Sequence, residues 1–278
     1  MYSTKKYMIC FSGIIVTSIF LTTSVFGNQK FNSFKSDGFE ISFINASETK
    51  YGNLFALFIK MKKDWKTYWR YPGESGFAPE FKVLSSKNFK KLEISWPTPK
   101  VFYENGTIIN GYKNDLILPI FILKNKNESH MEFELELTMG FCKDICIPIN
   151  FMISSKYAFK ASKTQNKMIL DSLNNTPKEL STSNSLVICD VKKIDDKMVL
   201  LSNLNNNFFS DKHYIDALIL EYKDDKVWFS EIKKISNSRY ISEIKSIDDK
   251  NFFLDKSKVK YTIITNSGGF EKTGCKSN

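Results

Sequence analysis

Hydrophobic and polar residues alternate along much of the chain, as they do in half-buried strands. Between residues 131 and 139, apolar side chains occupy the odd positions, and three glutamates and a threonine occupy the even ones. This period of two predicts a strand with one buried face and one face in water. Similar runs predict further strands at 39–47, 54–62, 91–97, 116–124 and 147–154. Turn signals separate the runs at 71–76, Asn105-Gly106 and Asn110-Gly111.

A polar stretch divides this pattern into two halves. Residues 161–184 are rich in Ser, Thr, Asn and Lys, with one short helical run before Pro177, so we expect a linker with a short helix there. Neither half alternates strands with helices, which predicts an all-β protein with antiparallel sandwiches: a first domain at 28–160 and a smaller one at 185–278. The expected strands of the second domain are 185–191, 197–204, 214–222, 226–232, 239–244 and 259–265.

The first 27 residues have the pattern of a secretory signal peptide. Lys5 and Lys6 precede an uncharged stretch at 8–26, and small residues stand where a signal peptidase reads. We therefore expect export and cleavage after Gly27. The alternative, an uncleaved membrane anchor, has nearly the required length but many Ser and Thr residues. We expect no stable membrane insertion after cleavage, because no later segment is apolar enough to span a bilayer.

The formal net charge of +10 changes this picture little. A basic excess can indicate nucleic-acid binding. The lysines are scattered among asparagines, however, without a basic run or a nucleic-acid motif. We interpret the charge as solvated surface and expect no nucleic-acid partner.

Cysteines are the candidates for chemistry. Cys10 would leave with the signal, and the four remaining cysteines of an exported chain indicate disulfides with three possible connectivities. Cys142 and Cys146 stand four positions apart. Bridged cysteines need α-carbons within about 4.4–6.8 Å, whereas four residues of extended strand span roughly 13 Å. If this pair is bridged, residues 143–145 must form a turn, which would place the pair at an accessible hairpin tip.

Loop entropy distinguishes the possible bridges. Closing a loop of about five residues stabilises by roughly 2 kcal/mol, and closing one of about 87 residues, from Cys189 to Cys275, by roughly 4–5 kcal/mol. The long bridge would therefore stabilise the fold more than the short one. The short one adds little stability, which favours a functional reading of Cys142 and Cys146.

The residues around the short pair have opposing effects. Lys143 would favour the reactive thiolate of Cys142, whereas Asp144 would oppose it, so we claim no net shift in the balance between thiol and thiolate. Pro148 removes a backbone donor and would set the path of the chain after Cys146.

Two other uses of the pair stay open. Two thiolates suit Cu(I) at low coordination, so Cys142 and Cys146 could belong to a copper-binding or copper-delivery protein. Zinc would need four ligands, and His130 and His213 are the histidines of the chain. The pair could also be an inert disulfide in a non-catalytic interaction module.

Four motifs resemble a known family. In order they are DWKTYWRYPGESGFAPEF, ISWPTPKVF, GYKNDLILPIF and GFCKDICIP. They resemble the N-terminal periplasmic domain of DsbD- and ScsB-type thiol–disulfide reductases and, more closely, stand-alone exported proteins that carry this domain. The resemblance covers about residues 38–160. LVICDV and GGFEKTGC, nearer the C-terminus, also occur in the stand-alone form and support a bridge between Cys189 and Cys275.

The resemblance implies an immunoglobulin-like β-sandwich in the periplasm, working as an oxidoreductase of the protein-disulfide type without a cofactor. Cys142 and Cys146 would shuttle between dithiol and disulfide. The implied partners are a membrane-embedded thiol–disulfide reductase and periplasmic thioredoxin-like proteins, in cytochrome c maturation or in repair of oxidised or metal-stressed thiols. The family also shields its dithiol with a lid, for which Tyr71 and Phe141 are candidates by position. The chain departs from DsbD in its closer cysteine spacing and in having no transmembrane electron-transfer segment.

Overall fold

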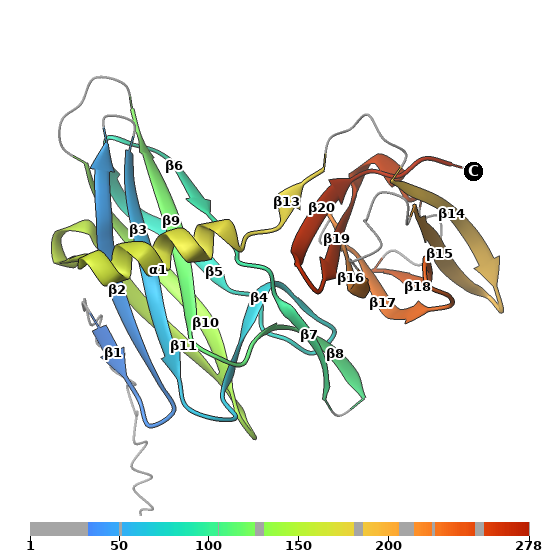
Figure 1. Cartoon of the computed structure of the whole chain (residues 1–278), viewed down its shortest axis with the longest axis horizontal. Coiled ribbons are helices and arrows are strands. Elements are labelled where there is room, and N and C mark those ends of the chain that lie inside the picture. The colour runs from blue at the N-terminus through green and yellow to red at the C-terminus, as the bar shows by residue number, and fades with distance from the viewer. Residues whose placement is uncertain are drawn as a thin grey trace, which may run out of the picture.

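Four β-sheets make up most of the described chain (Figure 1). The computed structural model describes residues 33–49, 52–104, 106–125, 131–180, 186–205, 214–223, 226–247 and 253–277. The predicted signal peptide at 1–27 lies outside them. None of the helices in the described ranges has the length and apolar character needed to cross a membrane. The prediction of an all-β protein is confirmed.

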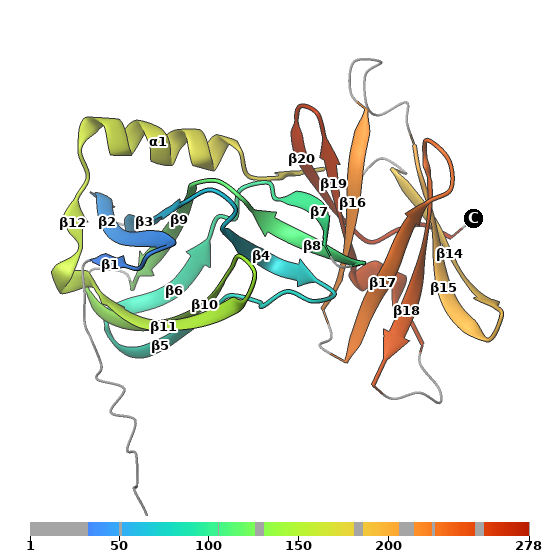
Figure 2. The same ribbon diagram turned by 90° about the horizontal axis from the view of Figure 1, so that it is seen from below.

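The first two sheets form an immunoglobulin-like sandwich (Figure 2). One sheet has the strand order β1-β2-β3-β9-β6, with β12 parallel to β2, and the other has β11-β10-β4-β8-β7, with β5 beside β10. The strands are β1 (Ser33–Lys35), β2 (Phe39–Thr49), β3 (Gly52–Met61), β4 (Lys66–Gly73), β5 (Glu80–Lys87), β6 (Phe89–Ile94), β7 (Lys100–Glu104), β8 (Thr107–Tyr112), β9 (Leu116–Lys124), β10 (Glu132–Cys142), β11 (Cys146–Ser154) and β12 (Phe159–Lys160).

Alternating side chains build the core between these sheets. In β10, Leu135, Leu137 and Met139 are completely buried, as the period of two predicts. Phe133 of β10 meets Phe55 of β3 edge to face, with ring centroids 5.1 Å apart. The strand with the clearest sequence pattern, β10, therefore packs its buried face against the opposite sheet.

The Asn110-Gly111 pair, predicted as a turn, lies within β8 instead. Gly111 is opposite Tyr68 of β4. A Cβ at Gly111 would overlap the carbonyl oxygen of Thr67, so this glycine allows two strands to approach closely rather than reversing the chain. The buried Asn110 amide donates to the carbonyl oxygen of Tyr71 at 3.0 Å.

Helix α1 (Lys163–Asn174) lies in the predicted linker at 161–184. It begins with a capping box: the Ser162 hydroxyl accepts from Gln165 N at 3.2 Å, and the Gln165 side chain accepts from Ser162 N at 2.9 Å. Ile169 is 1% exposed and packs against β2 and β3. The helix thus covers the outer face of the first sheet (Figure 2). The domain boundaries themselves stay a prediction.

The other two sheets form the C-terminal sandwich, with orders β13-β20-β19-β16 and β14-β15-β18-β17. Their strands are β13 (Lys178–Glu179), β14 (Val187–Ile194), β15 (Lys197–Leu204), β16 (Ile215–Tyr222), β17 (Val227–Lys234), β18 (Arg239–Ser246), β19 (Val259–Thr265) and β20 (Gly268–Thr273). The short 3₁₀ helix η3 (Lys256–Lys258) directly precedes β19. A disulfide joins Cys189 in β14 to Cys275 after β20, with α-carbons 5.7 Å apart. The bridge ties β14 to the segment that follows β20.

Candidate redox site

The β10–β11 hairpin carries the Cys142–Cys146 disulfide at its tip. The two residues are opposite each other in the ladder, and Gly140 is opposite Pro148 two positions further in. Residues 143–145 reverse the chain and bring the two α-carbons to 4.1 Å. The turn that a bridge requires is therefore present.

The two cysteines differ in accessibility. Cys142 is 1% exposed and lies in an apolar cluster with Tyr68 and Ile109. Cys146 is exposed, between Ile145 and Ile147, which are 76% and 43% exposed. An incoming thiolate can therefore reach Cys146 more readily than Cys142.

Strand β4 brings the Tyr68 phenol against both sulfurs. Its Oη lies 2.9 Å from Sγ of Cys142 and 3.2 Å from Sγ of Cys146. Burial raises the pKa of the Tyr68 phenol, and the negative charge of Glu104 raises it further. The hydroxyl therefore keeps its proton at neutral pH. It is a donor placed to bind a thiolate when the bridge opens.

The two lid candidates lie elsewhere. Phe141 is completely buried and stacks on Phe39, with ring centroids 3.8 Å apart. Its assignment as a lid residue is wrong, because consecutive strand residues face opposite sides and Phe141 faces the core. Tyr71 packs against the same core, and its phenol makes a hydrogen bond with the backbone of Phe229 in the C-terminal half.

Phe77 also lies beside the hairpin. A Cβ built on Gly140 would come within 2.8 Å of Phe77 Cβ and 3.1 Å of Tyr68 Cε2, so both residues pack against the bare backbone of this glycine. Phe77 itself is 37% exposed. Sequence reasoning missed it because it follows the turn signal at 71–76, and the direction of a loop side chain depends on the strands around it. Sequence reasoning also missed Tyr68, although it stands in an aromatic-rich run at 65–71.

A cluster of charges lies beside the tip. Lys66, which is 6% exposed, pairs with Glu104, and Glu104 also binds Lys113 at 2.9 Å. Burial alone would raise the pKa of Glu104, but its hydrogen bonds and charge interactions with the two lysines lower it overall. With Lys143 and Asp144, these residues line a cavity of about 660 Å³. The exposed Lys143 of the turn thus faces a polar surface of mixed charge.

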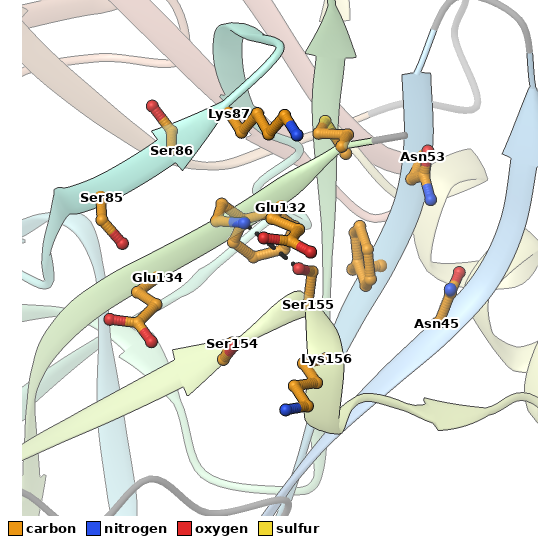
Figure 3. Close-up of a pocket in the computed structure, with 13 residues that line it drawn as sticks. Asn45, Asn53, Ser85, Ser86, Lys87, Glu132, Glu134, Ser154, Ser155 and Lys156 are labelled. Carbon is orange, nitrogen blue, oxygen red and sulfur yellow. Dashed lines mark hydrogen bonds between the residues drawn. The ribbon is translucent and has the colours of Figure 1, made fainter. Parts of the chain in front are cut away.

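A second hollow lies at the opposite end of the hairpin (Figure 3). Its volume is about 640 Å³, and its polar wall includes Glu132, Ser154 and Lys156. Ser155 accepts a hydrogen bond from Phe133 N at 3.2 Å within this wall. The cysteines do not line it, so it is separate from the redox site.

The copper alternative draws on the same cysteines. Once reduced, Cys142 and Cys146 would supply the soft thiolates that Cu(I) prefers. Within the described ranges, no group of three or more His, Cys, Asp or Glu residues could hold a metal ion; His130 and His213 lie outside those ranges. Copper binding by the pair stays a prediction, as does the interaction module with an inert bridge.

The fold and the site define an immunoglobulin-like domain with an accessible disulfide at a hairpin tip. Residues 38–153 match the family described as "Thiol:disulfide interchange protein DsbD, N-terminal". The crystal structure of the N-terminal periplasmic domain of ScsB from Proteus mirabilis shares the fold over both halves. It is 15% identical, with a TM-score of 0.64, and the match covers 87% of this chain and 95% of that one.

The similarity to other solved structures is weak. The yeast GGA1 GAE domain is 14% identical, with a TM-score of 0.26, over 44% of this chain and 94% of that domain. No curated protein matches the chain.

Proposed function

We propose that this protein is a periplasmic thiol–disulfide exchange protein whose redox pair is Cys142 and Cys146. It relays electrons from a membrane-embedded thiol–disulfide reductase to periplasmic thioredoxin-like proteins and other oxidised proteins, in cytochrome c maturation or in repair of metal-stressed thiols. One observation carries the proposal: a domain of a thiol:disulfide interchange family holds a disulfide with one exposed and one buried cysteine. The predicted signal peptide supports export.

The exposure of Cys146 assigns the steps of exchange. A thiolate of the donor attacks Sγ of Cys146, the bond to Cys142 breaks, and Cys142 leaves as a thiolate. The Tyr68 hydroxyl, 2.9 Å from that sulfur, donates a hydrogen bond to it. The donor's second thiolate then attacks its own sulfur in the mixed disulfide and releases Cys146. Two electrons and the donor's two thiol protons pass to the pair, and the donor leaves as a disulfide.

The same steps in reverse reduce an oxidised client. The Cys146 thiolate attacks the client disulfide, and one client sulfur leaves as a thiolate. The Cys142 thiolate then resolves the mixed disulfide at Cys146 and releases the second client sulfur. The buried cysteine is thus the resolving residue in this direction and the leaving group in the other.

Single serine variants test this assignment. In Cys142→Ser, the exposed Cys146 should accumulate a mixed disulfide with oxidised glutathione, because the resolving thiol is gone. In Cys146→Ser, the buried Cys142 should form this adduct much more slowly. Neither variant should complete exchange with a reduced thioredoxin-like protein. Thiol trapping followed by peptide mass spectrometry measures both the adducts and the exchange.

The double variant Cys189→Ser/Cys275→Ser is the matched control, because it removes the other disulfide. It should lose up to roughly 4–5 kcal/mol of stability and still exchange at the wild-type rate below its melting temperature. If Cys146→Ser exchanged disulfides at the wild-type rate, the proposed function would be wrong.

A further inference from the structure

The two halves of the protein meet at a partly buried group of charges. Arg70, on β4, donates from Nε and Nη2 to the two carboxylate oxygens of Glu221, at 3.0 and 2.7 Å. Its Nη2 also donates to Glu271 at 2.5 Å, and Lys260 binds the other oxygen of Glu271 at 2.5 Å. The Glu221 and Glu271 side chains are 16% and 8% exposed, so water screens these pairs weakly. We call Arg70, Glu221, Glu271 and Lys260 the Arg70 clamp.

Apolar contacts surround the clamp. Ile219 of β16 and Ile264 of β19 belong to the core cluster of the first sandwich, whereas their neighbours Leu220 and Ile263 face the core of the second. The sheet that holds β16, β19 and β20 therefore turns one face toward the first sandwich, as Figure 2 shows beside β4 and β8. The C-terminal half is docked against β4 and not merely tethered to it.

The clamped strand is the one that carries the phenol of the redox site. Arg70 follows Tyr68 by two residues, and Lys66, which pairs with Glu104, precedes it by two. Tyr68 thus lies between two ion-paired residues of its own strand. Lys66 is paired within the first sandwich, and Arg70 is paired with the C-terminal half.

The ion pairs of Arg70 lie in a part of β4 that makes few backbone pairs with its neighbouring strands. The register of β4 against β8 shifts between Tyr68 and Gly73, so residues 69–72 bulge from the ladder. The pairing of β4 with β10 is confined to Lys66 and Thr67. The chain just after Tyr68 is therefore positioned by side-chain contacts, among which the clamp is prominent; the Arg70 guanidinium also lies 4.1 Å from the Trp69 ring centroid.

We propose that the C-terminal half is part of the redox machinery: through the Arg70 clamp it holds the Tyr68 hydroxyl against Cys142 and Cys146, and it thereby sets the reduction potential of that pair. Arg70 is a positioning residue, because it acts through Tyr68. The proposal rests on the proposed function in taking the pair as a working dithiol. A phenol donates a stronger hydrogen bond to a thiolate than to a disulfide sulfur. A firmly held Tyr68 therefore favours the reduced form, and a loosened β4 lowers the potential.

A redox equilibrium in the whole exported chain tests the proposal. The protein disulfide and two molecules of glutathione form the dithiol and one molecule of glutathione disulfide, and thiol trapping with mass spectrometry reads the Cys142–Cys146 pair separately. Tyr68→Phe should lower the equilibrium constant for reduction by about threefold to tenfold, the value of one hydrogen bond, where tenfold corresponds to 29.6 mV. Arg70→Met should shift it in the same direction.

The double variant Tyr68→Phe/Arg70→Met is decisive. If Arg70 acts through Tyr68, the double variant should shift no further than Tyr68→Phe alone. Glu221→Gln, which keeps the shape of the side chain, should give a smaller shift of the same sign and serves if Arg70→Met folds poorly. Arg239→Met, at an exposed arginine of β18, is the matched control and should keep the wild-type potential.

Two results would overturn the proposal. One is a folded Arg70→Met or Glu221→Gln protein with a lower melting temperature and the wild-type potential, since the clamp would then only join the halves. The other is additive shifts in the double variant. Failure of the proposed function has a different signature, because it would be seen as wild-type exchange by the serine variants and leaves these potentials measurable.

Discussion

The absence of a side chain at Gly140 allows Phe77 and Tyr68 to pack directly against the hairpin. Its backbone, opposite Pro148 in the hairpin, is covered by Phe77 and by the ring of Tyr68. Any larger residue would push these side chains aside, including the Tyr68 ring, whose hydroxyl contacts both sulfurs. Tyr68 also packs against Cys142, together with Ile109, and Cys142 is buried whereas Cys146 is exposed.

Replacing Phe77 with alanine should speed reduction of the disulfide. The ring is 37% exposed beside the hairpin, and its loss should open the approach to Cys146 at a stability cost of about 1 kcal/mol. We expect a severalfold increase in the rate of Cys142–Cys146 reduction by dithiothreitol. Phe159→Ala, at a 47% exposed phenylalanine of β12, is the control. An unchanged rate in Phe77→Ala would show that the ring does not shield the pair.

Strand β4 marks the limit of what the sequence reveals. The strand at 131–139 was predictable, because one face meets the core and the other meets water. In β4, three consecutive residues make contacts with three different parts of the protein: Tyr68 contacts the disulfide, Trp69 packs in the core, and Arg70 binds the C-terminal half. No simple period results, and the Pro72-Gly73 signal belongs to the end of the strand.

For the candidate site, the sequence predicted the turn but not the side-chain contacts. The spacing of Cys142 and Cys146 required a turn, and the turn is present. The contacts of Tyr68 and the burial of Phe141 depend on the register between β4, β8 and β10, which residue spacing does not encode. Phe141, chosen as a lid residue by its position in the sequence, therefore faces the core instead.

The contact between β4 and β8 predicts different effects for two glycines. Gly111→Ala places a Cβ against the Thr67 carbonyl, so it should cost about 1–3 kcal/mol of stability and shift the Cys142–Cys146 potential by moving Tyr68. Gly106→Ala has open space but a φ of +79°, so it should cost about 1–2 kcal/mol without a redox effect. Urea unfolding and glutathione equilibration measure both. Equal potentials in the two variants would contradict this account of β4.

At the scale of the whole molecule, the two sandwiches share a core contact and the Arg70 clamp. Burial alone would raise the pKa of Glu271, but the charges and hydrogen bonds of Arg70 and Lys260 lower it overall. A carboxyl group whose pKa is lower in the folded state than the ordinary 4.5 stabilises the fold above that pH. This contribution is lost as the pH falls through the folded value. Acid should therefore weaken the contact between the halves.

Glu271→Gln tests this pH dependence. The wild-type free energy of unfolding should fall from about pH 5 downward as Glu271 takes up a proton. The variant should be less stable at pH 7 and should lose less stability between pH 5 and pH 3. Urea unfolding across this range gives the two curves. If the curves run parallel, Glu271 does not couple proton uptake to unfolding.

The exposed position of Cys146 at the hairpin tip determines which of the two sulfurs an approaching nucleophile meets first. Cys146 is open to solvent, whereas the protein itself surrounds Cys142, which is 1% exposed. Small thiols and large proteins therefore meet the same sulfur first. In the proposed exchange, the shape of the hairpin therefore directs the covalent intermediate to this one sulfur.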